Sequence, residues 1–313
     1  MVDWTRLRIE ALGERPEPIS EIQLPVLPAA MQEFCSLADD PDCSTARLAT
    51  SIESDAALTA GLLRIVNSSA FGLRHRVASV HHAITALGIR RTRLNVISLA
   101  MRNALPAKQL KLLCMSEFWS TNLEKAMFAR HVADLLRADR DLSSASALLQ
   151  DFMLPLMTNE YESTYLEYVR GDHDFPSLAQ FELKKFGWHH GEAAARAMCR
   201  WGFPDDLVCS VYFHHQGLQT MQNRNLRNSA ITASALAALM PDTLRQSPGG
   251  LDQLRQLDTI WAEFQLDDIA ESIEHEFTTQ HPGFPNHISF RERCAAERRA
   301  EERRQSVCAV DSF

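Results

Sequence analysis

Apolar residues recur every three or four positions along much of the chain, which is the spacing of one face of an α-helix. Four stretches show this spacing: Leu58, Leu62 and Ile65; Val80, Ile84 and Leu87; Leu94, Ile97 and Met101; and Phe128, Val132 and Leu135. No segment alternates apolar and polar residues in the way of a strand rich in Val, Ile and Thr. The pattern therefore predicts an all-α protein.

Residues that favour helix ends mark where several of these helices begin and stop. Ser44 follows a turn and is a suitable N-cap for a helix over residues 45–53. Pro204 and the two aspartates after it favour the start of another helix, because carboxylates stabilise the positive helix N-terminus. That helix is predicted to run to about His215 and to stop at Gly217.

Composition places the chain among ordinary globular proteins. The 313 residues are 45% hydrophobic and carry a formal net charge of -8, and this length suggests roughly two domains. No apolar run approaches the roughly 18–20 residues of a membrane helix. The N-terminus lacks a signal-peptide pattern, so the expected location is cytoplasmic. Seven cysteines without a Cys-x-x-Cys pair argue against a disulfide framework or a zinc ribbon, and Cys114, Cys199 and Cys209 are interpreted as core residues.

Charge is distributed unevenly. Residues 56–116 contain nine Arg and Lys residues and no Asp or Glu. One interpretation is a surface for an acidic partner, and the other is that this segment docks on the acidic remainder of its own chain. The candidate residues for the partner surface are Arg74, Arg76, Arg90, Arg91 and Arg93.

Familiar catalytic motifs are missing from the sequence. It contains no glycine-rich phosphate loop, no Ser nucleophile elbow and no H-E-x-x-H metal motif. Histidines instead occur as adjacent pairs, and neighbours on a helix point about 100° apart, so one pair cannot easily bind one metal with both rings. Metal ligation would require histidines to meet across helices.

The N-terminal third carries an ordered series of motifs. Residues 24–28 read Leu-Pro-Val-Leu-Pro and are followed by blocks over 48–59, 62–72 and 77–88. This series closely resembles the HDOD domain, the HD-related output domain of bacterial signalling proteins. The resemblance extends more weakly through later blocks to cover roughly residues 20–240.

The resemblance implies an all-helical domain related to the HD phosphohydrolases, which bind metal through a histidine, a His-Asp doublet and a later aspartate. Here the doublet corresponds to Gln150 and Asp151, and the earlier histidine corresponds to Thr121 or Asn122. Residues 229–238, the region of the late aspartate, contain no carboxylate. HDOD members generally lack part of the ligand set and act as signalling outputs through protein contacts.

An incomplete set of metal ligands predicts a site that neither binds metal nor catalyses a reaction. An amide is a poor ligand for a transition metal, and one aspartate with scattered histidines would not supply the ligands of a catalytic centre. We therefore expect no catalytic residue, no metal and no cofactor. Asp151 is expected to be buried and hydrogen-bonded in a vestigial site. The candidate residues of that site are Gln150, Asp151, Thr121, His189, His190, His214 and His215.

Five motif residues are expected to be structural: Asn67, Ser68, Phe71, Gly72 and Gly88. Gly72 and Gly88 follow apolar stretches, where a left-handed C-cap needs glycine. Asn67 lies at a predicted helix end, where its side chain can bond backbone groups as the chain turns.

The predicted architecture is an HD-domain-like helical bundle with an additional N-terminal helical lobe. An N-terminal extension (1–19) precedes the N-terminal lobe (20–110) and the HD-like lobe (111–240). C-terminal helices (241–280) would pack on the HD-like lobe, followed by a polar tail (281–313). The apolar stripe that predicts these C-terminal helices consists of Leu251, Leu254, Leu257 and Ile260.

Three functions remain open. The first is a non-catalytic signalling domain that docks on other signalling proteins: a sensor, a response regulator or a cyclic-dinucleotide enzyme. The second is a residual metal-dependent phosphohydrolase acting on a nucleotide or cyclic dinucleotide. The third is a nucleic-acid-binding regulator, which the net charge of -8 disfavours. No membrane partner is expected.

Overall fold

The computed structural model describes residues 2–13, 22–68, 76–105, 110–171, 174–281, 284, 287–296 and 299. These residues form helices joined by turns and coil, with no strand among them, so the all-α prediction is confirmed. No helix in these ranges is both long enough and apolar enough to cross a membrane.

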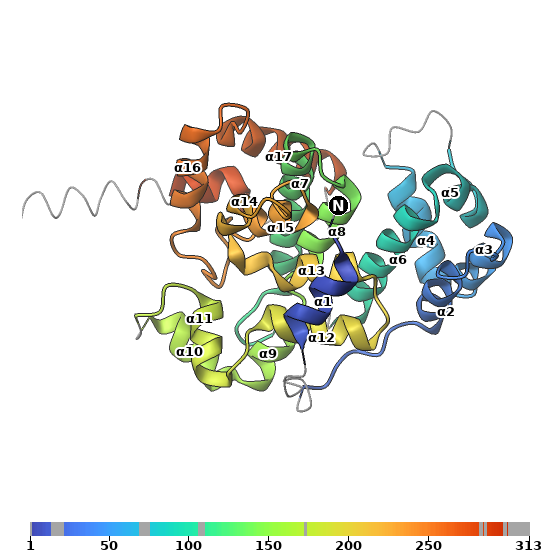
Figure 1. Cartoon of the computed structure of the whole chain (residues 1–313), viewed down its shortest axis with the longest axis horizontal. Helices are drawn as coiled ribbons and strands as arrows, with labels where there is room; N and C mark the ends of the chain where they lie inside the picture. The colour runs from blue at the N-terminus through green and yellow to red at the C-terminus, as the bar shows by residue number, and fades with distance from the viewer. Residues whose placement is uncertain are drawn as a thin grey trace, which may run out of the picture.

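Five helices form an N-terminal lobe: α2 (Ala29–Ala38), α3 (Thr45–Glu53), α4 (Ala56–Val66), α5 (Val80–Leu87) and α6 (Ile89–Ala104). α2 packs on α3 and α6, while α4 packs on α5 and α6. The apolar stripes of the sequence face inward here, because Leu58, Leu62 and Ile84 are almost completely buried. This lobe lies to one side of the molecule (Figure 1).

A second lobe is built around α7 (Met115–Leu136), which packs against α8 (Arg140–Leu149) and α15 (Ala230–Ala237). α12 (His190–Arg200) and α13 (Asp205–Tyr212) pack on each other, and α13 also packs on α8 and α15. All eight residues of α15 are buried, as expected for a helix that is surrounded by others on every side.

Shorter helices complete the second lobe. α1 (Trp4–Leu12) lies on α13, and α9 (Leu154–Glu160), α10 (Glu162–Arg170) and α11 (Leu178–Phe186) follow one another at one end (Figure 1). A 3₁₀ turn, η2 (His214–Gln216), follows α13 and packs on α15.

Two C-terminal helices, α16 (Gly250–Ile260) and α17 (Leu266–Gln280), join the second lobe: α17 packs directly on α7, and α16 packs on α17. The short helix α14 (Gln219–Gln222) packs on α15. Leu251, Leu254 and Leu257 are buried in a core shared with α7. Ile260 is 73% exposed, so its inclusion in the predicted apolar stripe was wrong: α16 ends at this residue.

Helix ends follow the predicted capping residues with one difference. Ser44 accepts a hydrogen bond from the backbone N–H of Arg47, and Gly88 ends α5 at φ +80°. The helix after Pro204 ends earlier than predicted, at Tyr212, and a 3₁₀ turn carries the next histidines. Phe71 and Gly72 lie outside the described residues, whereas Ser68 is half-buried in the turn after α4.

Two of the three cysteines predicted for the core are not buried. Cys209 is buried, but Cys199 is half-buried and Cys114 is exposed. Cys114 is the N-cap residue of α7, and its position at the beginning of the helix leaves the thiol near solvent.

The segment after residue 286 differs from the expected polar tail. Residues 290–296 are helical, and Phe290 and Cys294 are buried against α7. Glu124 of α7, itself fully buried, accepts a hydrogen bond from the backbone N–H of Phe290 and pairs with Arg293 at 2.7 Å. The buried carboxylate therefore fixes this segment to the second lobe, which the Arg/Glu-rich sequence did not indicate.

Asn67 joins the end of α4 to the segment that leads into α5. Its side-chain amide donates to the carbonyls of Leu63 (2.7 Å) and Val77 (2.8 Å), and its carbonyl accepts from the N–H of Val77 (2.8 Å). The Asn67 side chain thus holds the backbone of Val77, ten residues further along the chain, against the end of α4.

We expect Asn67→Ala to lower the free energy of unfolding by about 1–2 kcal/mol, because three hydrogen bonds are lost and two of them are partly buried. Chemical denaturation of the two proteins measures the difference. Asn103→Ala, at an exposed position of α6, is the control and should be neutral or slightly stabilising, since alanine is the better helix former. Equal stability of wild type and Asn67→Ala would contradict the structural role of Asn67.

Candidate functional site

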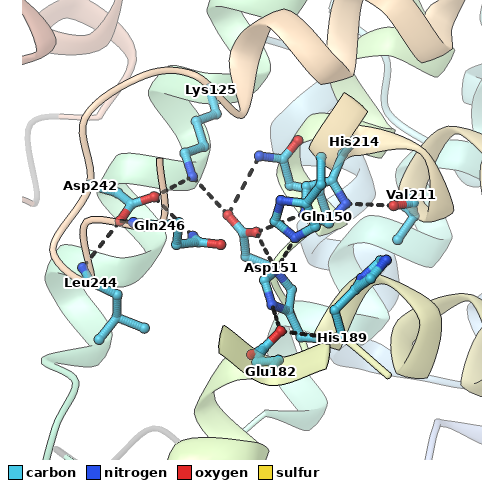
Figure 2. Close-up of polar contacts among 12 residues, drawn as sticks. Lys125, Gln150, Asp151, Glu182, His189, Val211, His214, Asp242, Leu244 and Gln246 are labelled. Carbon is cyan, nitrogen blue, oxygen red and sulfur yellow. Dashed lines mark hydrogen bonds and ion pairs between the residues drawn. The ribbon is translucent and has the colours of Figure 1, made fainter. Parts of the chain in front are cut away.

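A buried lysine lies at the centre of the second lobe. The Lys125 ammonium contacts Asp151 Oδ2 at 2.8 Å and Asp242 Oδ2 at 2.9 Å, and all three side chains are at most 6% exposed (Figure 2). Lys125 comes from α7, Asp151 from the turn after α8, and Asp242 from the loop after α15. The ion pair therefore joins three segments that are far apart in sequence.

The loop around Asp242 is shaped by its own carboxylate. Asp242 Oδ1 accepts from the backbone N–H groups of Leu244 and Gln246, and its Oδ2 accepts from the side-chain amide of Gln246. These bonds hold the carboxylate toward Lys125, as a short polar side chain does in an Asx turn.

The position that the resemblance assigned to the first histidine lies next to this lysine. Thr121 and Asn122 are buried on α7, and they line a small cavity together with Lys125, Asp151 and Asp242. The cavity measures about 10 Å³, which is room for about one water molecule.

Three histidines converge on the other side of Asp151. The ligand atoms of His190, His214 and His215 all lie within 4.8 Å of one another. His190 Nε2 and His214 Nε2 are each 3.5 Å from Asp151 Oδ1, and His215 Nε2 is 2.9 Å from His190 Nε2. The 3₁₀ turn brings both rings of the adjacent pair His214–His215 into one cluster, an arrangement that the 100° separation of neighbours on an α-helix did not predict.

A second buried carboxylate holds His190 in place. Glu182 of α11 accepts from His190 Nδ1 at 2.7 Å and from the His190 backbone N–H at 2.8 Å. The phenol of Tyr165 donates to the other oxygen of Glu182 at 2.6 Å. Each of these side chains is fully buried, and Glu182 thus fixes the orientation of the imidazole ring.

The ion pairs set the protonation of the cluster. Burial by itself raises the pKa of Asp151, but the Lys125 ammonium and the imidazoles of His190 and His214, each 3.5 Å from Asp151 Oδ1, hold that pKa well below its usual value. Burial by itself lowers the pKa of Lys125, but Asp151 and Asp242 bring that pKa above its usual value. Burial likewise opposes charge on His190, yet Glu182 and Asp151 raise the pKa of His190 to about 9.

The other two imidazoles behave in the opposite way. Burial lowers the pKa of His214, and burial together with neighbouring histidines lowers the pKa of His215 well below its usual value. His214 Nδ1 lies 2.6 Å from the carbonyl of Val211 and donates to it, so in the neutral ring the lone pair is on Nε2. That nitrogen and Asp151 Oδ1 are both buried without a hydrogen-bond partner.

The two orphaned atoms lie beside a group of donors that could hold a transition-metal ion. Three imidazole nitrogens and one carboxylate oxygen form a ligand set suited to zinc or iron, provided that His190 releases its proton when the metal binds. The second ring nitrogens of His190 and His214 bond a carboxylate and a backbone carbonyl, which is the usual support of metal-binding histidines. The fold thus gathers beside Asp151 three histidines that are scattered in the sequence.

The two remaining residues of the predicted site, Gln150 and His189, lie beside the cluster but do not contribute converging ligand atoms. Gln150 is fully buried, with its amide nitrogen 3.5 Å from Asp151 Oδ2 and its amide oxygen without a partner. His189 caps α12 by accepting from the N–H of Glu192, and it does not join the group of converging ligand atoms.

Sequence reasoning missed Lys125, Glu182, Tyr165 and Asp242. Lys125 follows Thr121 by one helical turn and therefore shares its face of α7. Asp242 lies four residues beyond residues 229–238, where the resemblance places the late aspartate. Glu182 and Tyr165 carry no local signal, because only the packing of α10 on α11 brings them together.

Part of the basic segment is paired with the rest of the chain. Arg90 contacts Asp139 and Asp206, and Arg91 pairs with Asp141 at 2.9 Å. Arg93 binds Asp39 and the carbonyl of Gly202. These three arginines of α6 therefore serve contacts within the molecule, in line with the intramolecular interpretation. Arg76 makes no such pair among the described residues, and Arg74 lies outside them.

Comparison with known families agrees with this architecture. A family profile for the HDOD domain matches residues 24–217, more than half of the chain. The chain belongs to the HDOD family. An uncharacterized protein of Treponema pallidum (strain Nichols) is 23% identical over 198 residues, which cover 61% of this chain and 37% of that protein. The HDOD chain thus matches well under two thirds of this relative's length.

Solved structures share the fold. An HDOD domain protein with unknown function from Geobacter sulfurreducens superposes with a TM-score of 0.60 at 17% identity, covering 99% of both chains. A candidate metal-dependent phosphohydrolase from Shewanella amazonensis SB2B gives a TM-score of 0.62 at 16% identity, covering 90% of this chain and 100% of that one. The likeness shows the fold and confirms the HD-domain-like helical bundle.

We expect Lys125→Met to lower the free energy of unfolding by about 3–5 kcal/mol, because it leaves two buried carboxylates without their cation. Denaturant titration followed by circular dichroism measures this loss. Lys111→Met is the matched control and should change little, since Lys111 pairs with Glu162 at the surface.

A triple variant separates charge from packing. Lys125→Met combined with Asp151→Asn and Asp242→Asn removes both orphaned charges and should recover most of the stability lost by Lys125→Met alone. A triple variant no more stable than the single variant would contradict the electrostatic account.

Proposed function

We propose that this HDOD protein is a non-catalytic signalling domain that acts through contacts with other proteins. The observation that carries the proposal is the Lys125 ammonium between Asp151 and Asp242. The protein supplies its own cation to two carboxylates of the kind that bind metal in HD phosphohydrolases. A fixed ammonium neutralises charge but offers no open coordination position and generates no hydroxide nucleophile.

The closed surroundings of the site support the same conclusion. A catalytic metal centre keeps one position open for water or substrate, whereas structural centres are closed. Asp151, His190 and His214 are at most 1% exposed, and the cavity beside Lys125 holds about 10 Å³. The cavity beside Lys125 therefore has no room for a phosphodiester, and Asp151, His190 and His214 present almost no surface to one.

A residual phosphohydrolase is the second candidate, because the cluster of Asp151, His190, His214 and His215 fits a metal ion. A metal there would supply Lewis acidity in an enzyme. Within the closed cluster, we propose that it would only hold η2 and α12 together. Nucleic-acid binding has weaker support, because Arg90, Arg91 and Arg93 are engaged within the chain.

The hydrolase candidate is tested with protein purified without chelator, its metal content measured, and samples supplemented with Mn²⁺, Fe²⁺ or Zn²⁺. We expect no hydrolysis of bis(4-nitrophenyl) phosphate or of a cyclic dinucleotide above the level of an Asp151→Asn control, with or without bound metal. Metal-dependent turnover that disappears in Asp151→Asn would establish an enzyme and overturn the proposal.

The proposal that the domain acts by binding other proteins is tested separately, by isolating a partner. Affinity capture from the native host, followed by reconstitution with the purified candidate, should yield a saturable complex with a signalling protein. Failure to reconstitute any captured pair from purified components would count against protein docking as the mode of output.

A further inference from the structure

A cleft lies between the N-terminal lobe and the C-terminal helix α17. It encloses about 1070 Å³ and is lined by the last turns of α4, the segment before α5, and the end of α17. Its accessible apolar lining includes Ala60, Leu63 and Ala78, and Thr279 and Gln280 supply polar groups from the opposite side. Ligand sites in proteins commonly occur in such clefts between lobes and measure about 300–1,000 Å³.

Two arginines line this cleft without a counterion. Arg64, in the last turn of α4, and Arg76, just before Val77, form no ion pair with any residue that the structure describes. The flanking sequence supplies none either, because residues 69–75 and 281–288 contain no Asp or Glu. Glu276, on the same helix as Gln280, is already paired with Arg130.

A third guanidinium adds to the positive charge. Arg102, in the last turn of α6, lies near Phe284 at 6.0 Å and close enough to Arg64 that burial and this neighbour lower the pKa of Arg102. Like charges placed together without a carboxylate repel each other, and the repulsion is relieved when an anion binds between them.

The positions of the arginines are held by Asn67. Its side chain ties Leu63 on α4 to Val77, the residues next to Arg64 and Arg76 in sequence. The two guanidinium groups are therefore presented from one braced edge, which reduces the entropy lost when a ligand binds.

We propose that this cleft binds a small phosphate-bearing molecule of nucleotide size, with its phosphate groups held by Arg64 and Arg76. The planar guanidinium fork matches phosphate oxygens in pairs, and the apolar lining suits a base or sugar. An acidic peptide would use the charge but leave the apolar lining without a partner. The proposal is independent of the buried Lys125 cluster, so either can fail without the other.

Calorimetric titration of the full chain with GTP, ATP, inorganic pyrophosphate and a hexaglutamate peptide tests the site. We expect a nucleotide to bind at one site per chain, pyrophosphate to bind more weakly, and the peptide not to bind. Arg64→Gln combined with Arg76→Gln should weaken nucleotide binding at least about tenfold, the loss expected when charge-assisted hydrogen bonds are removed. Raising the salt concentration should weaken binding as well.

Controls separate the site from general effects of charge and folding. Arg47→Gln, an exposed change on α3 in the same lobe, should leave binding unchanged. Arg64→Lys with Arg76→Lys should bind with intermediate affinity, because charge remains and the fork is lost. Each variant should keep the wild-type melting temperature, since neither arginine forms an ion pair within the described chain.

Three results would overturn the proposal. These are the absence of saturable binding of any phosphate compound at about 1 mM, equal nucleotide affinity in the double Gln variant, and binding of hexaglutamate in preference to the nucleotides. The last result would assign the cleft to an acidic protein segment.

Discussion

A single ammonium group determines how the second lobe closes. Lys125 is buried on the central helix, where an unpaired charge would be strongly unfavourable, and it is stable there only because Asp151 and Asp242 both reach it. Each carboxylate belongs to a different connection, one after α8 and one after α15. The requirement for charge compensation therefore fixes two loops against α7 more strictly than apolar packing would, since an apolar core tolerates alternative arrangements more readily.

Asp151 links this ion pair to the histidine cluster. One of its oxygens faces Lys125 and the other faces His190 and His214, so charge on either side affects the other. Glu182 extends the chain of buried polar groups to α11, and its three donors leave it well satisfied. The result is a continuous polar layer through the lobe, in which Asp151 Oδ1 and His214 Nε2 are two orphaned atoms that face each other at 3.5 Å. A proton or a metal ion at that place completes the layer without opening it to solvent.

Local sequence signals predicted the elements well and the interactions between them poorly. The helical spacing and capping residues such as Ser44 depend on neighbours within a few positions, and the structure follows them. Asp151 was located by its motif, but Lys125 was not noticed because a lysine on a helix is usually solvated, and nothing within one turn shows that two distant carboxylates surround it. The convergence of His214 with His190 depends on the 3₁₀ turn after α13, a backbone choice that the adjacent histidines do not reveal.

The arginines of the basic segment divide into two groups with different consequences. Those of α6 that pair with Asp139, Asp141 and Asp206 join the N-terminal lobe to the second lobe at its α8 and α13 side. The cleft between the end of α4 and the end of α17 is bordered by both lobes. Among the described residues no ion pair crosses it, so no salt bridge fixes the distance between α4 and α17 there. A ligand that contacts Arg64 on one wall and Gln280 on the other stabilises the arrangement in which both are reached, by an amount set by its affinity and concentration. Because α17 packs on α7, that stabilisation would extend to the helix that carries Lys125, which is a physical route from ligand binding in the cleft to the second lobe.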